Sequence, residues 1–419
     1  MKRSWVVSTV VCLGLLQPLI GHAESDGFIR LNGKTLFPLG FYELPTTDAD
    51  LKAMAESGVN LVRCGTGGDL DRVHTAGVLG WMPLPLDGGA TEPLRSRIEA
   101  VKDHPALAVW EGPDEVVWNF TAFSGLYKNQ GVYQDKDEWW KQTPRAIEYS
   151  EARAAEIIPN MRAAAELIRA LDPHGRPLWL NEALRSDVRF VRECLQFYDI
   201  TGCDIYPVSG LERKVERMGG ATDRWLQLSK GKPIWMVMQA FSWDELGPDY
   251  AERGTAYPSF MESRFMAYDV IAHGAKGILY WGSSYLKSNE FRTSLYALIS
   301  ELNALQPFLV APHAAEANVE LVELTEERAG LGVAMTARRA GEDWLIVLAN
   351  DDTVPRMGVV VNGLGALEGR ELFELYGNEK RVVTAGEIVT RIQPREAKVF
   401  CTSRVYEVPR GAGRDYPGQ

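Results

Sequence analysis

An acidic pair, Asp114 and Glu115, follows a short apolar segment and is well suited to proton-transfer chemistry. Residues 107–110 are apolar, which predicts a strand that is buried on both faces. Gly112 and Pro113 end regular strand pairing, so we expect both carboxyl groups where the strand meets its loop. Enzymes with parallel β-barrels keep their catalytic groups at this end of the strands. The alternative is a junction whose acids only face solvent.

The segments around this pair alternate between strand and helix patterns. After an expected hairpin at residues 28–36, with Asn32-Gly33 at its turn, we predict eight strands. They cover residues 37–42, 59–63, 80–84, 107–110, 177–181, 200–206, 233–238 and 277–281. Such βα units form either a closed barrel or an open doubly wound sheet. The lack of a Gly-rich phosphate loop after the first strand favours an α/β fold of the (β/α)8 TIM-barrel type over residues 24–312.

The pattern changes after this region. Short strands separated by turn residues fill residues 313–406 and predict a small C-terminal β-sandwich. Two domains also agree with the chain length, because single cores stop growing beyond about 250–300 residues. The tail, residues 407–419, is rich in Gly and Pro and is expected to be disordered.

Residues 1–23 have the pattern of a secretory signal peptide. Lys2 and Arg3 precede an apolar run, and Gly21-His22-Ala23 forms a small-residue cleavage site. The run is too short to favour a membrane span. We therefore expect a protein that is secreted or periplasmic. Its oligomeric state does not follow from the sequence.

Composition excludes several partners. The net charge of -11 argues against nucleic acid, which requires clustered Lys and Arg, and against an anionic membrane surface, while it agrees with a neutral substrate. Beyond the signal, Cys64, Cys194, Cys203 and Cys401 are far apart and lack the spacing of a zinc site. We expect them to be free and buried, and we expect neither a metal nor a cofactor.

The segment from His104 to Glu115 resembles the fourth-strand motif of clan A glycosidases. The closest likeness is to the β-galactosidase and β-glucuronidase family, whose motif begins His-Pro, passes a Trp and ends Asn-Glu. In that family the Glu is the general acid/base, which implies this role for Glu115. Asp114 stands where the family has Asn, and we expect it to contact substrate.

Further positions resemble the same clan. Residues 58–63 are similar to a second-strand motif whose Arg, here Arg63, lies beneath the reacting sugar. Tyr206 ends the sixth strand, where clan members often place a Tyr, and Asp204 shares its side of the strand two residues earlier. Trp281, at the end of the eighth strand, matches an aromatic that forms the floor of the sugar subsite. Each could instead be an ordinary salt-bridge or core residue.

The seventh strand departs from the clan. Residues 232–241 resemble the segment that carries the nucleophilic Glu, but Met238 or Gln239 occupies that position. Neither can attack an anomeric carbon as a carboxylate does, so a retaining mechanism cannot be carried over directly. Gln239 could still donate a hydrogen bond to a sugar hydroxyl or a water.

Three interpretations follow. In the first, Glu115 is the acid and a second carboxylate, Asp204 or Glu182, activates water with inversion. In the second, a displaced acid is the nucleophile, the candidates being Glu43, Asp244 and Glu245. In the third, the barrel binds a glycan without hydrolysing it.

The segment between the fourth strand and the next helix, residues 116–149, is long and rich in aromatics. Long loops at this face of a barrel usually carry function, and aromatic faces pack well on sugar rings. Its aromatic residues are Trp118, Phe120, Phe123, Tyr127, Tyr133, Trp139, Trp140 and Tyr149. We expect Trp118 to contact the sugar, whereas about half of the set would only pack the insertion onto the barrel.

The sequence as a whole predicts a secreted glycoside hydrolase that cleaves a polysaccharide or oligosaccharide. The residues expected to hold the sugar are Arg63, Asp114, Tyr206, Gln239, Trp281, Glu43 and Trp118. A carbohydrate-binding protein without activity is the alternative, and a purely structural protein is less favoured because it gives no reason for the aromatic loop.

Overall fold

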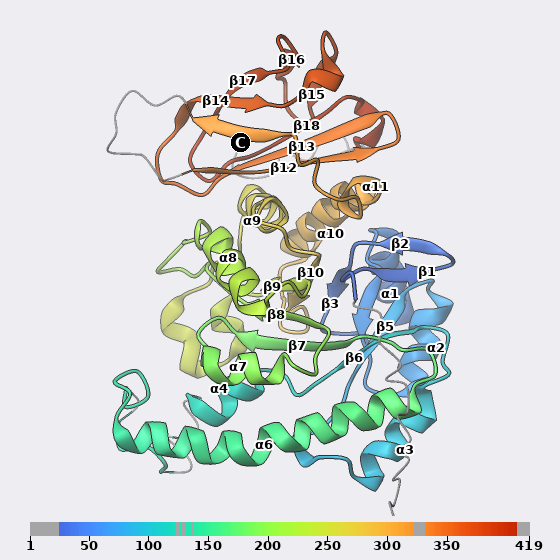
Figure 1. The fold of residues 1–419 in the computed structure, drawn as a ribbon, viewed down its shortest axis with the longest axis vertical. Helices are drawn as coiled ribbons and strands as arrows, with labels where there is room; N and C mark the ends of the chain where they lie inside the picture. The colour runs from blue at the N-terminus through green and yellow to red at the C-terminus, as the bar shows by residue number, and fades with distance from the viewer. Residues whose placement is uncertain (1–24, 123–125, 127–130, 136, 322–331, 409–419) are drawn as a thin grey trace, which may run out of the picture.

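The computed structural model describes residues 25–122, 126, 131–135, 137–321 and 332–408. Eight parallel strands close into a barrel in the order β10-β3-β4-β5-β6-β7-β8-β9. Figure 1 shows these strands enclosed by helices. The barrel strands are β3 (Leu39–Phe41), β4 (Leu61–Arg63), β5 (Leu79–Pro83), β6 (Leu107–Glu111), β7 (Leu178–Ala183), β8 (Ile200–Asp204), β9 (Ile234–Gln239) and β10 (Gly277–Trp281). The predicted α/β barrel is therefore confirmed.

The helices between the strands begin at side-chain caps. Thr66 and Ser259 form capping boxes, and Thr47, Thr91 and Ser288 accept a backbone N–H of the following turn. The α-helices are α1 (Asp48–Glu56), α2 (Gly67–Thr75), α3 (Glu92–Val101), α4 (Val116–Thr121), α6 (Pro144–Leu171), α7 (Val188–Cys194), α8 (Arg217–Ser229), α9 (Phe260–Ala272), α10 (Asn289–Ala304) and α11 (Gln306–Leu309). Short 3-10 turns are η1 (Leu86–Gly88), η2 (Trp243–Leu246) and η3 (Pro248–Arg253).

Large side chains fill the barrel interior and support the residues above them. Trp179 and Trp235 pack with ring centroids 5.1 Å apart. A Cβ on Gly202 would lie 1.6 Å from the backbone oxygen of Trp235, so only glycine fits between these strands. Below this layer, the predicted hairpin is confirmed as β1 (Ile29–Leu31) and β2 (Lys34–Leu36). The indole of Trp235 donates to the Gly27 carbonyl at its start (2.8 Å).

The C-terminal β domain contains two antiparallel sheets around a second apolar core. One sheet has the order β11-β14-β17, and the other has the order β12-β13-β18-β15-β16. The strands are β11 (Asn318–Leu321), β12 (Val333–Ala340), β13 (Asp343–Asn350), β14 (Arg356–Asn362), β15 (Glu371–Glu374), β16 (Lys380–Val382), β17 (Ile388–Ile392) and β18 (Ala397–Cys401), with turns η5 (Gly365–Leu367) and η6 (Arg404–Tyr406). The change from barrel to strands thus falls after α11, where the sequence pattern changes.

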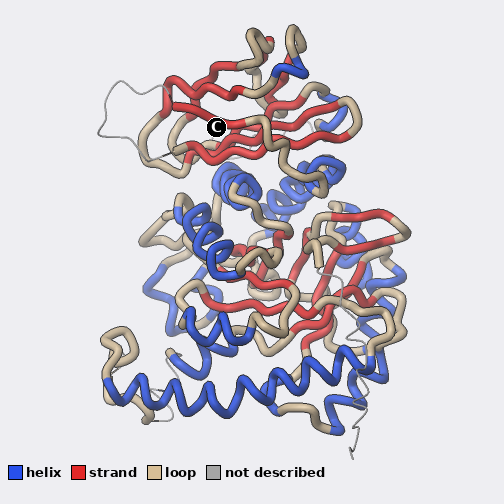
Figure 2. The backbone as a smooth tube through the Cα atoms, viewed as in Figure 1, coloured by secondary structure: helices blue, strands red, loops and turns tan. Residues whose placement is uncertain are grey.

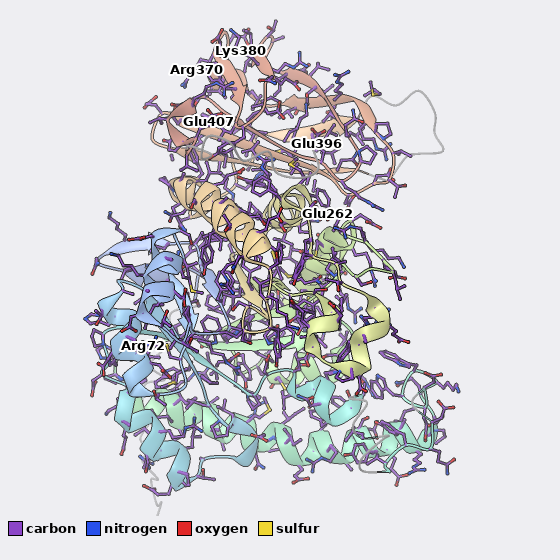
Figure 3. The ribbon with its side chains drawn as sticks, turned by 180° about the vertical axis from the view of Figure 1, so that it is seen from behind. Arg72, Glu262, Arg370, Lys380, Glu396 and Glu407 are labelled. Atoms are coloured by element: carbon purple, nitrogen blue, oxygen red, sulfur yellow. The ribbon has the colours of Figure 1, made fainter. Side chains whose placement is uncertain are left out.

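The β domain lies against one side of the barrel. Figures 1 and 2 show it next to α9 and α11, and Figure 3 shows Arg370 and Lys380 at its far side. Buried polar groups connect the two domains: the Arg264 guanidinium pairs with Glu301 (2.7 Å) and donates to the Ala397 carbonyl (2.9 Å).

Cys64, Cys194, Cys203 and Cys401 are buried and free, as expected. No helix among the described residues is long and apolar enough to cross a membrane. The expected signal peptide, residues 1–23, lies outside the described residues, as does most of the tail.

Candidate active site

Polar side chains replace apolar ones at the carboxyl ends of several barrel strands. Alternate residues of a strand point the same way, so each polar residue continues an inward-facing row. Each polar residue comes two positions after an inward-facing residue of its strand. The pairs are Leu61 and Arg63 on β4, Val109 and Glu111 on β6, Trp179 and Asn181 on β7, and Gly202 and Asp204 on β8. The eight-stranded closure brings these ends together above the tryptophan layer.

The lower part of the site is an ion pair. Arg63 Nε donates to Glu111 Oε2 (2.6 Å), and the Trp81 indole donates to the same oxygen (3.1 Å). Glu111 is fully buried, and burial raises its pKa to about 7 although Arg63 acts in the opposite direction. The Arg63 guanidinium also lies 5.3 Å from the ring centroid of Tyr42. Arg63 therefore supports the floor of the site through Glu111.

Glu115 has an unusual backbone conformation. Its φ of 49° and ψ of 38° are left-handed, a conformation that costs free energy for a residue with a side chain. Its N–H donates to the Asn181 carbonyl on β7 (3.1 Å), and α4 begins immediately after it. This turn between β6 and α4 places the Glu115 side chain beside β8.

Glu115 and Asp204 form a hydrogen-bonded carboxyl pair. Burial is the largest cause that raises the pKa of each group, and the neighbouring Glu115 raises that of Asp204 further, well above its usual range. A hydrogen bond between two carboxyl groups requires a proton, and such a pair titrates as a unit. Simultaneous ionisation of the two carboxyl groups is therefore disfavoured: burial raises both pKa values, Glu115 raises that of Asp204 further, and the hydrogen bond with Asp204 lowers that of Glu115.

Asp114 completes the cluster. Its Oδ1 accepts a hydrogen bond from Asn181 Nδ2 (2.9 Å), and the same amide donates to Asp204 Oδ2 (3.3 Å). Burial raises the pKa of Asp114, while Arg63 and Asn181 lower it. The buried Tyr42 hydroxyl has no hydrogen-bond partner among the described residues. Burial raises the pKa of Tyr42 well above its usual range, and the charge on Asp114 is the next largest cause.

An aromatic wall borders these carboxyl groups. Tyr206 stacks on Trp281, with ring centroids 5.4 Å apart at 27°, and Phe241 and Trp243 pack edge-on against Tyr206. A pocket of about 420 Å³ opens beside the wall, and Asp204, Tyr206, Trp118 and Trp243 are among its lining residues. Tyr206, Trp281 and Trp118 therefore lie at the same face as Glu115, the first two as the resemblance implied and Trp118 as the aromatic loop indicated.

Glu182 lies apart from this cluster. Its carboxylate accepts hydrogen bonds from the Val117 N–H (2.8 Å), the Trp118 N–H (3.2 Å) and the Ser186 hydroxyl (2.6 Å). It is fully buried, and burial raises its pKa to about 8. Because neighbouring strand residues point to opposite faces, Glu182 faces the helices while Asn181 faces the barrel. Glu182 anchors the start of α4, and we do not assign it to catalysis.

The Gln239 side chain is also occupied by hydrogen bonds to the backbone. It exchanges hydrogen bonds with the Val208 N–H (3.0 Å) and carbonyl (2.8 Å) and donates to the Phe241 carbonyl (3.0 Å). It is 1% exposed. Its amide thus holds the loop after β8 against the end of β9, so we do not assign Gln239 to sugar binding.

The displaced acids have structural partners as well. The Glu43 carboxylate accepts hydrogen bonds from the Gly282 N–H (2.8 Å) and from the N–H and hydroxyl of Ser283. These bonds join the ends of β3 and β10. Asp244 accepts from Ser242 and Thr255, and Glu245 accepts from Tyr257 and the Lys287 N–H. None of these three carboxylates lies in the Glu115–Asp204 cluster.

The aromatic loop divides as expected. Phe120, Tyr133 and Trp139 are buried, whereas Trp118 and Trp140 pack on each other (5.7 Å) and Trp140 is 47% exposed. Phe123 and Tyr127 lie outside the described residues. Sequence reasoning missed Glu111, Tyr42 and Trp81. The period-2 row on β6 could have indicated Glu111, since it follows an inward Val by two residues.

No protein-family model and no curated protein matches the chain. Solved structures do match. The β-galactosidase from Bacillus circulans sp. alkalophilus is 8% identical, with 88% of this chain and 99% of that one covered and a TM-score of 0.53. A glycoside hydrolase family 5 protein from Bacteroides vulgatus is 14% identical, with 92% and 94% covered and a TM-score of 0.51.

The chain spans 60% of the length of another match, the β-galactosidase from the psychrophilic Marinomonas ef1, at 15% identity and a TM-score of 0.45. At these identities the likeness concerns the fold. The chain has the TIM-barrel fold of glycoside hydrolases together with a C-terminal β domain, in agreement with the fold that the fourth-strand motif implied.

Proposed function

We propose that this protein is a glycoside hydrolase and that the Glu115–Asp204 pair supplies the proton to the departing glycosidic oxygen. The observation that carries the proposal is the buried Glu115–Asp204 carboxyl pair at the carboxyl ends of the barrel strands, with Asp204 lining an open pocket. General acid catalysis requires a carboxyl group that stays protonated near neutral pH, and burial together with a like charge produces one.

Asp204 acts as the proton partner of Glu115. Carboxyl groups that flank a sugar are about 5 Å apart in retaining enzymes and about 6.5–9.5 Å apart in inverting ones. A pair in direct hydrogen-bond contact leaves no room for a sugar between its members. The water-activating role considered for Asp204 is therefore replaced by proton sharing. After Glu115 protonates the departing oxygen, the water that attacks the anomeric carbon loses a proton to the Glu115–Asp204 pair and so restores it.

Asp114 supplies the second carboxylate of the mechanism. It adjoins Glu115, and although burial raises its pKa, both Arg63 and Asn181 favour its ionised form. A negative charge at this position stabilises the positive charge that develops at the anomeric carbon in an oxocarbenium-like transition state. Asp114 thus takes the part that the missing carboxylate at the end of β9 would otherwise play.

The substrate in this proposal is a polysaccharide or an oligosaccharide. The stacked Tyr206 and Trp281 and the pocket residues Trp118 and Trp243 offer aromatic faces to the CH-rich faces of sugar rings. Export of the chain, with removal of residues 1–23, belongs to the same proposal, because polysaccharides are met outside the cell.

The test is product release from a panel of glycosides and polysaccharides by the protein without residues 1–23. Glu115→Gln should lower turnover by about 100-fold or more while circular dichroism stays unchanged. Glu193→Gln changes an exposed carboxyl group that does not line this pocket, and it should leave turnover unaltered.

Full activity of Glu115→Gln would overturn the assignment. Glycan binding without product release by either protein would instead establish the carbohydrate-binding alternative.

A further inference from the structure

The pocket beside the Glu115–Asp204 pair carries positive charge, in contrast to the chain as a whole. Four cationic side chains line it, namely Arg185, Lys214, Arg217 and Arg253, against two acidic ones, Asp204 and Glu212. Lys214 pairs with Glu212 (2.8 Å), and Asp204 belongs to the proton-sharing pair. The local balance is therefore positive although the net charge of the chain is -11.

Among the described residues, the three arginines form no ion pair, although the exposed Glu212 carboxylate interacts electrostatically with Arg217 and Arg253. Within the described part of the chain, the guanidinium groups of Arg185, Arg217 and Arg253 have neither a carboxylate within ion-pair distance nor a hydrogen-bond acceptor. Other arginines near the barrel are paired, as Arg63 is with Glu111 and Arg213 is with Glu262. Unpaired arginines that gather in one pocket leave their hydrogen-bond donors available to a ligand.

Aromatic rings hold two of these guanidinium groups. The Arg253 guanidinium carbon lies 3.8 Å from the ring centroid of Trp243, and that of Arg185 lies 5.5 Å from the centroid of Trp140. Stacking on a ring orients the guanidinium plane and leaves the N–H groups at its edge free. The groups are thus positioned before a ligand arrives, which lowers the entropic cost of binding.

The arginines come from three successive connections at the active face. Arg185 follows β7, Arg217 begins α8 after β8, and Arg253 ends η3 after β9. All three line the pocket that also contains Asp204 and Tyr206. A group bound by these arginines would therefore belong to a sugar that is adjacent to the proposed reaction centre.

We propose that the pocket selects an anionic saccharide, whose carboxylate or sulfate groups bind Arg185, Arg217 and Arg253 while its rings pack on Trp118 and Trp243. Guanidinium groups match the planar oxygen pairs of carboxylates and sulfates with two parallel hydrogen bonds. This inference rests on the proposed glycosidase and names its substrate class. It replaces the neutral substrate that the net charge of the chain favours.

Binding to the inactive Glu115→Gln protein tests the proposal without requiring turnover. The probes are a galacturonate oligosaccharide, dextran sulfate of similar length and neutral dextran, measured by titration calorimetry at low and moderate salt. We expect at least one anionic probe to bind about tenfold or more tightly than neutral dextran. The preferred probe distinguishes carboxylate from sulfate recognition.

Variants of the arginines locate the effect. Arg217→Gln and Arg253→Gln should each weaken binding of the anionic probe by about tenfold. Arg370→Gln is the matched control, because Arg370 lies at the far side of the β domain (Figure 3) and its loss should not change binding.

Three results would overturn the proposal: equal binding of neutral dextran, unchanged binding in both arginine variants, or no binding of either anionic probe. Loss of binding in the arginine variants supports it even where no hydrolysis is found, so its outcome is separate from that of the proposed activity.

Discussion

Replacing Arg63 with Met removes the guanidinium that lies 2.6 Å from Glu111 Oε2 but keeps an apolar stem in its place. Glu111 is fully buried, and burial raises its pKa to about 7 even with Arg63 beside it. An opposite charge this close lowers a carboxyl pKa by about 1–3 units. In Arg63→Met, Glu111 should therefore titrate about 1–3 units above its present value.

The sign of the effect on stability follows from proton linkage. Folding raises the pKa of this carboxyl group above its unfolded value of about 4.3. The free energy of unfolding is therefore unaffected by the group below that pH and decreases as the pH rises from there to the folded pKa. In the unaltered protein this decline ends near pH 7, since that is where Glu111 titrates. In Arg63→Met it continues above pH 7, by about 1.4 kcal/mol for each further unit.

The assay is urea unfolding followed by tryptophan fluorescence at pH 6 and pH 9. Relative to the unaltered protein, Arg63→Met should lose about 1–3 kcal/mol more stability at pH 9 than at pH 6. The double variant Arg63→Met/Glu111→Gln lacks the titrating group, so its difference should not depend on pH. An equal loss for Arg63→Met at both pH values would refute the burial argument.

Three further predictions concern the same face of the barrel. Asp204→Asn replaces the proton partner with an amide that donates to Glu115. Turnover at pH 7 should fall by about 100-fold and recover as the pH falls toward about 4, which a pH–rate profile would measure. A loss that is independent of pH would contradict proton sharing. Glu182→Gln presents an amide to backbone N–H groups and should lower unfolding stability by about 2 kcal/mol in urea, with turnover of the folded protein retained. Gly202→Ala places a Cβ 1.6 Å from the Trp235 oxygen and should reduce stability by about 3 kcal/mol, whereas an unchanged urea midpoint would show that the strands can separate.

Most of the architecture could be predicted from local patterns. Apolar segments of strand length that alternate with helical segments specify parallel βα units, and the Asn32-Gly33 turn specifies the hairpin, because both depend on neighbours in the chain. The β domain followed from the change in that pattern after α11.

The candidate site was harder to predict than the fold. The fourth-strand motif indicated Glu115, and resemblance indicated Arg63, Tyr206 and Trp281, which the barrel does bring to one face. Glu182 and Asn181 are neighbours in sequence, but the pleat turns only Asn181 inward. The register between neighbouring strands decides which residue of such a pair points into the barrel, and this register cannot be read from the sequence.

The sequence alone determined that this chain forms a barrel whose strands end in acidic and aromatic residues, because strand periodicity and turn chemistry are local properties. Only the tertiary structure decided that Glu115 and Asp204 form a buried carboxyl pair and that the Gln239 amide is occupied by backbone hydrogen bonds. It also decided that arginines from three successive connections, none of them in an ion pair with a described residue, meet in one pocket of an acidic protein. Ring closure of the barrel creates these contacts, since it brings together side chains whose interaction depends on distance and burial rather than on sequence separation.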